Sequence, residues 1–340
     1  MPTTPPLPAL SVLDLAFITD ETTPRVALRH TRDLARHAEE LGYRRFWLAE
    51  HHNAPGVASA ATAVLIGHVA DGTSTIRVGA GGVMLPNHAP LIVAEQFGTL
   101  ASLYPDRVDL GLGRSSGTDE PTQLALRRAG GSFPHDIEEL RSYLAEPEPD
   151  APVRAYPGAG ERVPLWVLGS SPSGASVAGR LGLPFAFASH FAPDNLAPAL
   201  ATYRAEFRPS AQLDRPYVMV SANTVVADTD GEAWHAFTAY QQYMVNNIFR
   251  RPWRPLPAPV DDIDAYWQPH ERHTVGRILR LSLVGSTATV RDRLTDLAEM
   301  SQADEIIVTP TDHTHEGRRR SLELLALARR EAGLSHVTGA

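Results

Sequence analysis

The feature that most constrains the fold is the repeated alternation of short β-rich runs with longer helical patterns along the chain. The runs are rich in β-branched and aromatic residues, which favour strands. Between two of them, the spacing of Leu34, Ala38 and Leu41 predicts a helix. Gly42 is expected to end that helix as its C-terminal cap. The eight predicted strands span residues 12–18, 45–49, 75–85, 107–112, 164–168, 184–188, 217–227 and 304–310.

Eight strand–helix repeats favour a closed parallel (β/α)8 barrel, the TIM-barrel fold of the α/β class. A doubly wound open sheet would give the same alternation, so periodicity alone does not separate the two, and the number of strands favours the barrel. We expect one domain over residues 1–340, with 1–10 as a flexible tail. Two long interruptions, 114–163 and 246–284, are expected to be insertions that cover the active-site face.

Composition excludes several classes of protein. The chain has no cysteine, so it can form neither a disulfide framework nor a thiolate metal site. Its net charge of −8 is spread along the sequence, without the basic stripe of a nucleic-acid-binding protein. No apolar run has spanning length, and the first residues lack the features of a signal peptide. A cytoplasmic location without membrane or nucleic-acid partners is therefore expected.

A polar cluster, "EHHN", follows the second predicted strand. Active sites of barrels lie at the carboxyl ends of the strands, so this cluster is a candidate for chemistry. Successive side chains of a strand alternate in direction, which places Glu50 and His52 on one side and His51 on the other. The two histidines are thus poorly placed to share a metal, and no metal site is expected. His51 can serve as a proton-transfer group, although a purely structural role at the strand end would account for the same sequence.

Glycines and hydroxyls follow three other predicted strands. Gly81 and Gly82 interrupt the third strand, where glycine marks a bulge, a bend or the close approach of a ligand. Arg114 follows the fourth strand and offers a guanidinium to an anion. After the fifth strand, Gly169, Ser170, Ser171 and Ser173 precede or open a helix, whose N-terminus could bind phosphate. Ordinary N-capping by Ser171 accounts for that pattern equally well.

Taken in order, these segments resemble the bacterial luciferase-like flavin-dependent monooxygenases over nearly the whole chain. The most specific are "EELGYRRFWLAEHHN", "VGAGGVMLPNHAPLIVAEQFGTL", "YPDRVDLGLGR" and "LGSSPSGASVAGRLGLPFAFASHFAP". The resemblance implies a TIM barrel with insertions that binds reduced FMN (FMNH2), delivered by a separate NAD(P)H:flavin reductase. The enzyme would be a two-component monooxygenase that oxidises a small organic or natural-product substrate with O2, through a C4a-(hydro)peroxyflavin.

The resemblance also assigns residues. His51 falls on the catalytic histidine, and Gly81-Gly82 falls on a cis peptide against which the isoalloxazine packs. Arg114 falls on the phosphate-binding arginine. The phosphate loop falls on Gly169, Ser170, Ser171 and perhaps Ser173, with Gly169 standing where luciferases have an acidic residue.

Several further expectations follow from the same comparison. Asp119 or Glu120 is a candidate partner of His51. Ser189 and His190 are expected to face the substrate space, with a structural role favoured for His190. A homodimer is expected through the helical segments 58–70 and 90–103, because relatives dimerise there and both are rich in small and apolar residues.

Three alternative functions stay open. The nearest is an F420-dependent oxidoreductase that transfers hydride without O2. The second is a non-catalytic flavin-binding barrel, against which the presence of His51 and Arg114 argues. The last is a metal hydrolase, which the absence of an HExxH motif makes least favoured.

Overall fold

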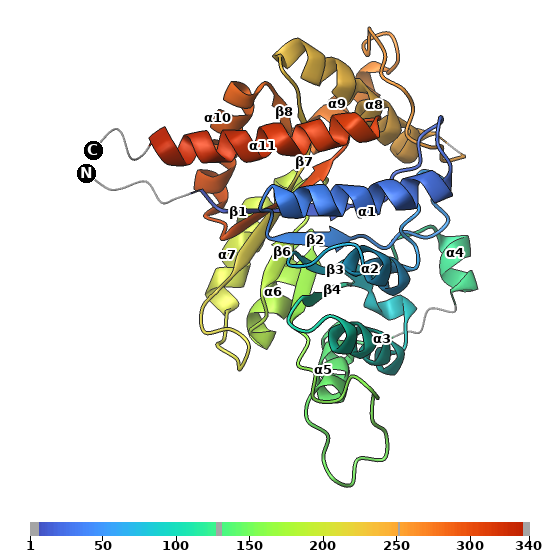
Figure 1. The fold of residues 1–340 in the computed structure, drawn as a ribbon, viewed down its shortest axis with the longest axis vertical. Helices are drawn as coiled ribbons and strands as arrows, with labels where there is room; N and C mark the ends of the chain where they lie inside the picture. The colour runs from blue at the N-terminus through green and yellow to red at the C-terminus, as the bar shows by residue number, and fades with distance from the viewer. Residues whose placement is uncertain (1–6, 127–130, 251, 336–340) are drawn as a thin grey trace.

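The computed structural model describes residues 7–126, 131–250 and 252–335. Its parallel strands close into a barrel surrounded by helices, which confirms the predicted fold class (Figure 1). The barrel strands, in sheet order, are β1 (Ala9–Asp14), β2 (Arg45–Leu48), β3 (Arg77–Met84), β4 (Val108–Gly113), β5 (Leu165–Gly169), β6 (Phe185–Phe187), β7 (Val218–Val226) and β9 (Glu305–Pro310). Each of the predicted strands corresponds to one of them.

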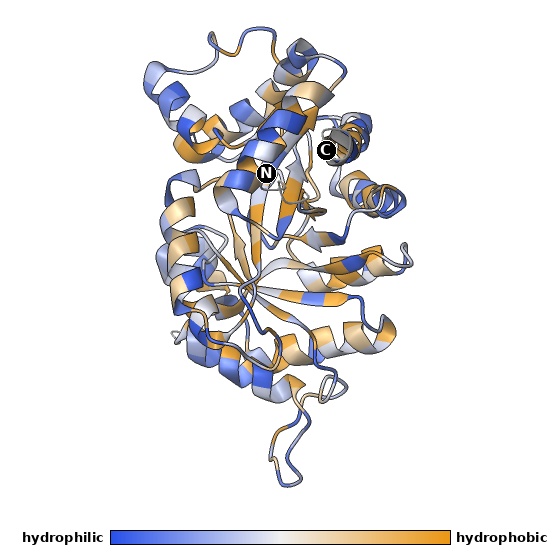
Figure 2. Cartoon of the chain, turned by 90° about the vertical axis from the view of Figure 1, so that its left-hand side faces the viewer, coloured by the Kyte–Doolittle hydropathy of each residue, from blue (hydrophilic) through white to orange (hydrophobic). Residues whose placement is uncertain are grey.

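The outer layer consists of the helices that follow the strands along the chain. These are α1 (Pro24–Glu40), α2 (Thr62–Ala70), α3 (Pro90–Leu103), α6 (Pro172–Leu181), α7 (Leu196–Glu206), α8 (Asp230–Phe249), α10 (Thr287–Ser301) and α11 (His315–Ser335). Figure 2 shows many hydrophobic residues on the central strands and a mixture of hydrophobic and hydrophilic residues on the surrounding helices. No helix in the described ranges combines the length and the apolar character needed to cross a membrane.

Helix α1 shows how local sequence sets an element's limits. Thr23 caps its N-terminus by accepting a hydrogen bond from the backbone N–H of Val26, and Pro24 occupies the first turn. Leu34 and Ala38 face the core. The helix ends before Gly42, whose φ of +81° is the left-handed conformation that glycine adopts without strain, as the sequence predicted.

The two expected insertions contain additional elements. Residues 114–163 hold α4 (Glu120–Ala125) and α5 (Phe133–Leu144). Residues 246–284 hold α9 (Pro269–Ile278) and most of β8 (Leu283–Gly285), a short strand that the sequence did not predict. Strand β8 pairs with the end of β7 outside the closed barrel. Short 3₁₀ turns occur at η1 (Leu85–Asn87) and η2 (Pro193–Asn195).

The N-terminal segment differs from the expectation of a flexible tail over residues 1–10. Residues 1–6 lie outside the described part of the chain, but Leu7 and Leu10 are buried in the main hydrophobic core. The Arg329 guanidinium donates a hydrogen bond to the carbonyl of Pro8, 2.7 Å away. Strand β1 therefore begins at Ala9, earlier than predicted. It also ends earlier, at Asp14, because Ala16 takes a positive φ of 53° that leaves the extended conformation.

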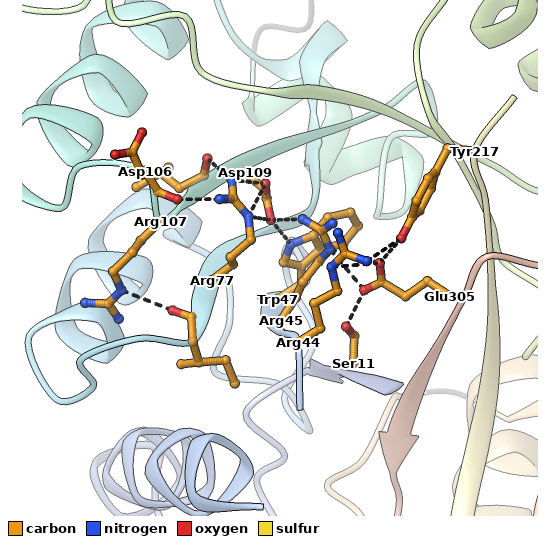
Figure 3. Close-up of polar contacts among 12 residues, drawn as sticks. Ser11, Arg44, Arg45, Trp47, Arg77, Asp106, Arg107, Asp109, Tyr217 and Glu305 are labelled. Atoms are coloured by element: carbon orange, nitrogen blue, oxygen red, sulfur yellow. Dashed lines mark hydrogen bonds and ion pairs between the residues drawn. The ribbon is translucent and has the colours of Figure 1, made fainter. Parts of the chain in front are cut away.

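A network of charged side chains fills the amino-terminal end of the barrel (Figure 3). Arg45 donates to Asp109 at 2.7 Å and to Glu305 at 3.0 Å, so one guanidinium joins carboxylates from opposite sides of the barrel. Arg77 also pairs with Asp109, at 2.6 Å, and the Tyr217 hydroxyl donates to Glu305 at 2.8 Å. Both carboxylates are fully buried, and each is paired, as burial of charge requires.

Aromatic side chains separate this network from the carboxyl end of the barrel. The Trp47 indole N–H donates to Asp109 at 3.2 Å, and its ring meets the edge of the Trp166 ring, with centroids 5.0 Å apart. Trp47 packs in the same cluster as Leu13, Met219 and Ile307. The network and the aromatic layer thus fill the amino-terminal end of the barrel interior. The space inside the barrel lies at the carboxyl ends of the strands.

Candidate functional site

A cavity of about 710 Å³ lies above the aromatic layer, at the carboxyl ends of the strands. Its floor includes Leu13, Trp47, Met219 and Ile307, and its walls come from loops that follow most of the barrel strands. Volumes of this size hold drug-sized ligands or cofactors, and barrels place their sites at this face. The cavity thus lies at the end of the barrel where the sequence analysis expected the active site.

One side of the cavity is polar. Arg114, just after β4, lines it together with Ser170 and Ser171, which join β5 to α6. The Arg114 guanidinium donates to the Ser173 hydroxyl at 3.0 Å. Ser171 is the N-cap residue of α6, but its side chain makes no capping hydrogen bond. Ordinary capping therefore does not occupy this hydroxyl, and a cation, hydroxyls and a helix N-terminus meet at one place.

Ser173 and Gly169 contribute to this polar side in different ways. Ser173 is not among the residues that line the cavity, and it contacts Arg114 from the first turn of α6. Gly169 lines the cavity, and a Cβ there would lie 3.2 Å from the Phe185 ring and 3.4 Å from the Cα of Gly174. This crowding is the physical reason why a larger acidic residue at position 169 would require a shift of its neighbours.

The peptide bond between Gly81 and Gly82 is cis, as the resemblance implied. It lies at the irregularity in the β3–β4 register between Ala80 and Val83. Gly81 lines the cavity, whereas Gly82 is not among the lining residues. A Cβ on Gly81 would lie 2.7 Å from Leu13, and one on Gly82 would lie 2.7 Å from the carbonyl oxygen of Gly111. A side chain is thus excluded at Gly82, where the obstacle is backbone, whereas at Gly81 it would have to displace the end of the Leu13 side chain. The backbone itself forms the cavity wall at Gly81.

The Glu50-His51-His52 cluster divides between two sides of the chain, as strand alternation predicted. His51 lines the cavity. Glu50 turns away and is 1% exposed, with its Oε1 atom 2.8 Å from His52 Nε2 and 2.9 Å from His88 Nε2. Its Oε2 atom accepts a hydrogen bond from the backbone N–H of Met84 at 3.2 Å. One carboxylate thereby ties together the loops that follow β2 and β3.

The electrostatics of the two sides differ. Burial alone would raise the pKa of Glu50, but hydrogen bonds from His88, His52 and the Met84 N–H lower it below its ordinary value. Burial lowers the pKa of His51, and the nearby charge of Glu50 only partly opposes this. His51 Nδ1 is buried and has no hydrogen-bond partner among the described residues. A neutral imidazole at the cavity wall is able to accept a proton.

Glu50, His52 and His88 have the ligand atoms of a metal site, all within 4.8 Å of one another. In this structure both imidazoles instead contact the same carboxylate oxygen directly. His51 is not part of the group, because it faces the cavity on the other side of the chain. No sequence pattern indicated His88, because it reaches Glu50 from another loop.

Of three expectations about neighbouring residues, two need correction and one is confirmed. The Asp119 carboxylate caps α4 and contacts Asn53, and Glu120 lies in the first turn of that helix, so neither is placed as the partner of His51. Ser189 is buried and donates to the Ser221 carbonyl at 2.6 Å, so it does not face the cavity. His190 lines the cavity, as expected for a residue that faces the substrate space. Tertiary contacts decide all three placements, and the local sequence does not contain them.

Both insertions contribute to the cavity walls. From 114–163 come the residues following Arg114 and the aromatic ring of Phe133. From 246–284 come Asn247, Trp253 and Arg254, next to Tyr243 of helix α8. The first set lies beside the polar side of the cavity, and the second combines the Trp253 ring with the polar side chains of Asn247 and Arg254.

Substitution Glu50→Gln is expected to lower the free energy of unfolding at neutral pH by about 1–3 kcal/mol, because it weakens charge-assisted hydrogen bonds in a buried site. The lowered pKa of Glu50 means that its stabilisation is present above the unfolded-state value and is lost as pH falls through the folded-state value. Urea unfolding from neutral pH down to about pH 3 should therefore show a smaller pH dependence in the variant, and the difference should develop below about pH 5, where an unfolded-state glutamate begins to bind protons. The exposed Glu21→Gln is the control. Equal pH dependence in wild type and Glu50→Gln would contradict this role.

Comparison with known proteins agrees with this arrangement. A protein of Escherichia coli strain K12 named luciferase-like monooxygenase is 50% identical over 320 residues, which cover 93% of this chain and 95% of that protein. The N-acetyl-S-alkylcysteine monooxygenase of Bacillus subtilis is 38% identical over 187 residues, or 53% of this chain and 56% of that protein. The crystal structure of apo-MsnO8 superimposes with a TM-score of 0.87 at 38% identity, covering 95% of this chain and 98% of that one. The family model for luciferase-like monooxygenases matches residues 9–303, and the chain belongs to this family.

Proposed function

We propose that this protein is a flavin-dependent monooxygenase that uses reduced FMN and O2 to oxidise a small organic or natural-product substrate. The observation that carries the proposal is the joining, in one cavity, of an anion-binding side at Arg114 and Ser171 with the bare backbone of Gly81 and with His51. Bound reduced FMN would supply the electrons that activate O2, so that one oxygen atom enters the substrate and the other leaves as water.

The residues of the cavity fit the parts of FMN. Arg114, Ser170, Ser171 and the N-terminus of α6 would hold the phosphate, with Ser173 orienting the Arg114 guanidinium. The bare backbone at Gly81, where a Cβ would meet the Leu13 side chain, would support the flavin ring. The largely apolar floor would keep water from the reacting atoms. His51, neutral and at the cavity wall, would move a proton.

The source of reduced flavin is a second part of the proposal. The sequence has no dinucleotide-binding fingerprint, which supports delivery by a separate NAD(P)H:flavin reductase. Proteins with this fold include a Baeyer-Villiger monooxygenase in complex with FMN and an alcohol dehydrogenase with an F420–acetone adduct. F420-dependent hydride transfer is thus the alternative that a cofactor experiment must separate.

Substitution Arg114→Ala tests the phosphate assignment. The variant should weaken FMN binding by about 1.5–3 kcal/mol, the contribution of a charged hydrogen bond, while the affinity for riboflavin, which lacks the phosphate, changes little. Titration calorimetry with both ligands measures the difference. Arg180→Ala, which removes an exposed arginine of α6 that pairs with Glu206, is the control. Equal losses for FMN and riboflavin would show that Arg114 supports the fold or the ring instead.

Substitution His51→Ala tests the proton-transfer assignment, with His52→Ala as its matched neighbour. The His51 variant should fold and bind FMN, but turnover coupled to a flavin reductase should fall by roughly 100- to 10,000-fold. The His52 variant should mainly lose stability, because His52 contacts Glu50 and not the cavity. Circular dichroism, urea unfolding and coupled turnover measure the two effects. Near-normal turnover of the His51 variant would refute the assignment, and the reverse pattern would exchange the two roles.

The exposed faces of α2 and α3 support a homodimer. Val64 is 76% exposed, Ile92 46% and Leu103 63%, and the two helices pack beside each other on the outside of the barrel (Figure 1). Covering these side chains would remove apolar surface from water. Light scattering at micromolar concentration should give twice the chain mass of 36.9 kDa. Val64→Glu should shift the protein towards monomer, and a monomeric wild type would overturn the proposal.

A further inference from the structure

His190 is a cavity residue that the proposed roles of Arg114, Gly81 and His51 do not use. It follows β6, and its ring is half-buried at the cavity wall. The preceding residue, Ser189, turns away and bonds to the backbone of Ser221. The Asn223 side chain donates to the His190 carbonyl at 2.9 Å, and the Phe191 ring meets the imidazole edge-on, with centroids 4.8 Å apart. The backbone around His190 is therefore anchored, and its imidazole packs against Phe191.

The hydrogen bonds of Ser221 determine which nitrogen of His190 carries the proton. The Ser221 hydroxyl is 3.1 Å from the Phe187 carbonyl oxygen, which can only accept, so the hydroxyl proton points there. The same Oγ atom accepts from the His190 backbone N–H at 3.3 Å. His190 Nδ1 lies 2.5 Å from this oxygen and must then be the donor. The geometry favours the Nδ1–H tautomer, which leaves a lone pair on Nε2.

Among the described residues, Nδ1 is the only His190 ring nitrogen with a hydrogen-bond partner, so the Nε2 lone pair has none. The Nε2 atom is not among the fully buried atoms that lack a partner. Since the ring lines the cavity, Nε2 is open to it. Burial, and secondly the neighbouring His51, lower the pKa of His190 to about 4, so the imidazole is neutral at neutral pH. A neutral acceptor on a wall otherwise formed by groups such as Met219 and Phe187 selects for a hydrogen-bond donor.

We infer that His190 determines substrate specificity: its Nε2 atom accepts a hydrogen bond from an O–H or N–H group of the substrate, and Ser221 fixes the tautomer that makes this possible. The substrate class is a largely apolar molecule with one hydroxyl or amine group. The inference rests on the proposed function in taking this cavity as the substrate site. It adds a recognition group that is distinct from the proton-transfer role of His51.

The tautomer is measured directly on the wild-type protein by nitrogen-15 NMR with labelled histidine. His190 should show a protonated Nδ1 and an unprotonated Nε2, and this pattern should invert or become mixed in Ser221→Ala. A wild-type His190 protonated at Nε2 would overturn the inference. The wild-type spectrum decides this point even if the Ser221 variant does not fold, and the result does not depend on whether the protein is a monooxygenase.

Recognition is measured with a pair of matched aromatic compounds, 2-naphthol and 2-methoxynaphthalene, which differ in one hydrogen-bond donor. Wild-type protein, with FMN or as isolated, should bind the naphthol roughly 2- to 10-fold more tightly, the range of one neutral hydrogen bond. His190→Asn keeps a donor towards Ser221 but loses the Nε2 acceptor, so the affinity ratio should fall to about one. His235→Asn, outside the cavity, should leave the ratio unchanged.

Two results of this experiment would overturn the inference: a ratio near one in the wild type, or an unchanged ratio in His190→Asn. In Ser221→Ala, a proton on Nε2 would favour the ether oxygen, so the ratio should fall as well. Because both measurements are made without turnover, loss of the proposed monooxygenase activity and loss of donor recognition are observed independently.

Discussion

The Arg45 guanidinium, held between the buried carboxylates of Asp109 and Glu305, is the interaction on which the interior of this barrel depends. An isolated buried charge is costly, so the two acids and the arginine must be placed together, and this links β2, β4 and β9 across the barrel. Arg77 completes the pairing of Asp109 from β3. The amino-terminal half of the interior is thereby filled with polar groups whose hydrogen bonds are satisfied.

This filled half gives the cavity its closed floor. Trp47 connects the two regions, since its indole N–H reaches Asp109 below while its ring belongs to the apolar layer above. Above that layer, the charged carboxylate and the neutral imidazoles point in different directions. Glu50 faces away from the cavity and bonds the loops together, whereas the imidazoles of His51 and His190 face inward and are kept neutral by burial. The Glu50 carboxylate is thus kept out of the space where an apolar substrate and a flavin would meet. Arg114, at the wall after β4, lies beside hydroxyls suited to phosphate.

The sequence predicted the barrel because strand and helix periodicities are local and were repeated along the whole chain. The opposite directions of Glu50 and His51 were predictable for the same reason, since alternation is a property of extended backbone. Strand β8 was missed because three residues carry too little periodicity, and its pairing with β7 is a tertiary contact. The flexible tail was predicted to extend too far, to residue 10, because the burial of Leu7 depends on a core that distant segments assemble. His88 and Ser221 were missed for a similar reason: each acquires its role from a residue on another loop or strand.

The central claim is that the cavity is built for FMN, and equilibrium titration of the purified protein under anaerobic conditions tests it most directly. Reduced FMN, oxidised FMN and F420 would be titrated separately, with flavin fluorescence and calorimetry as the readouts. The account predicts saturable binding of FMN, with the reduced form bound at one site per chain and F420 bound far more weakly. Tight binding of F420 together with no measurable binding of reduced FMN would contradict it.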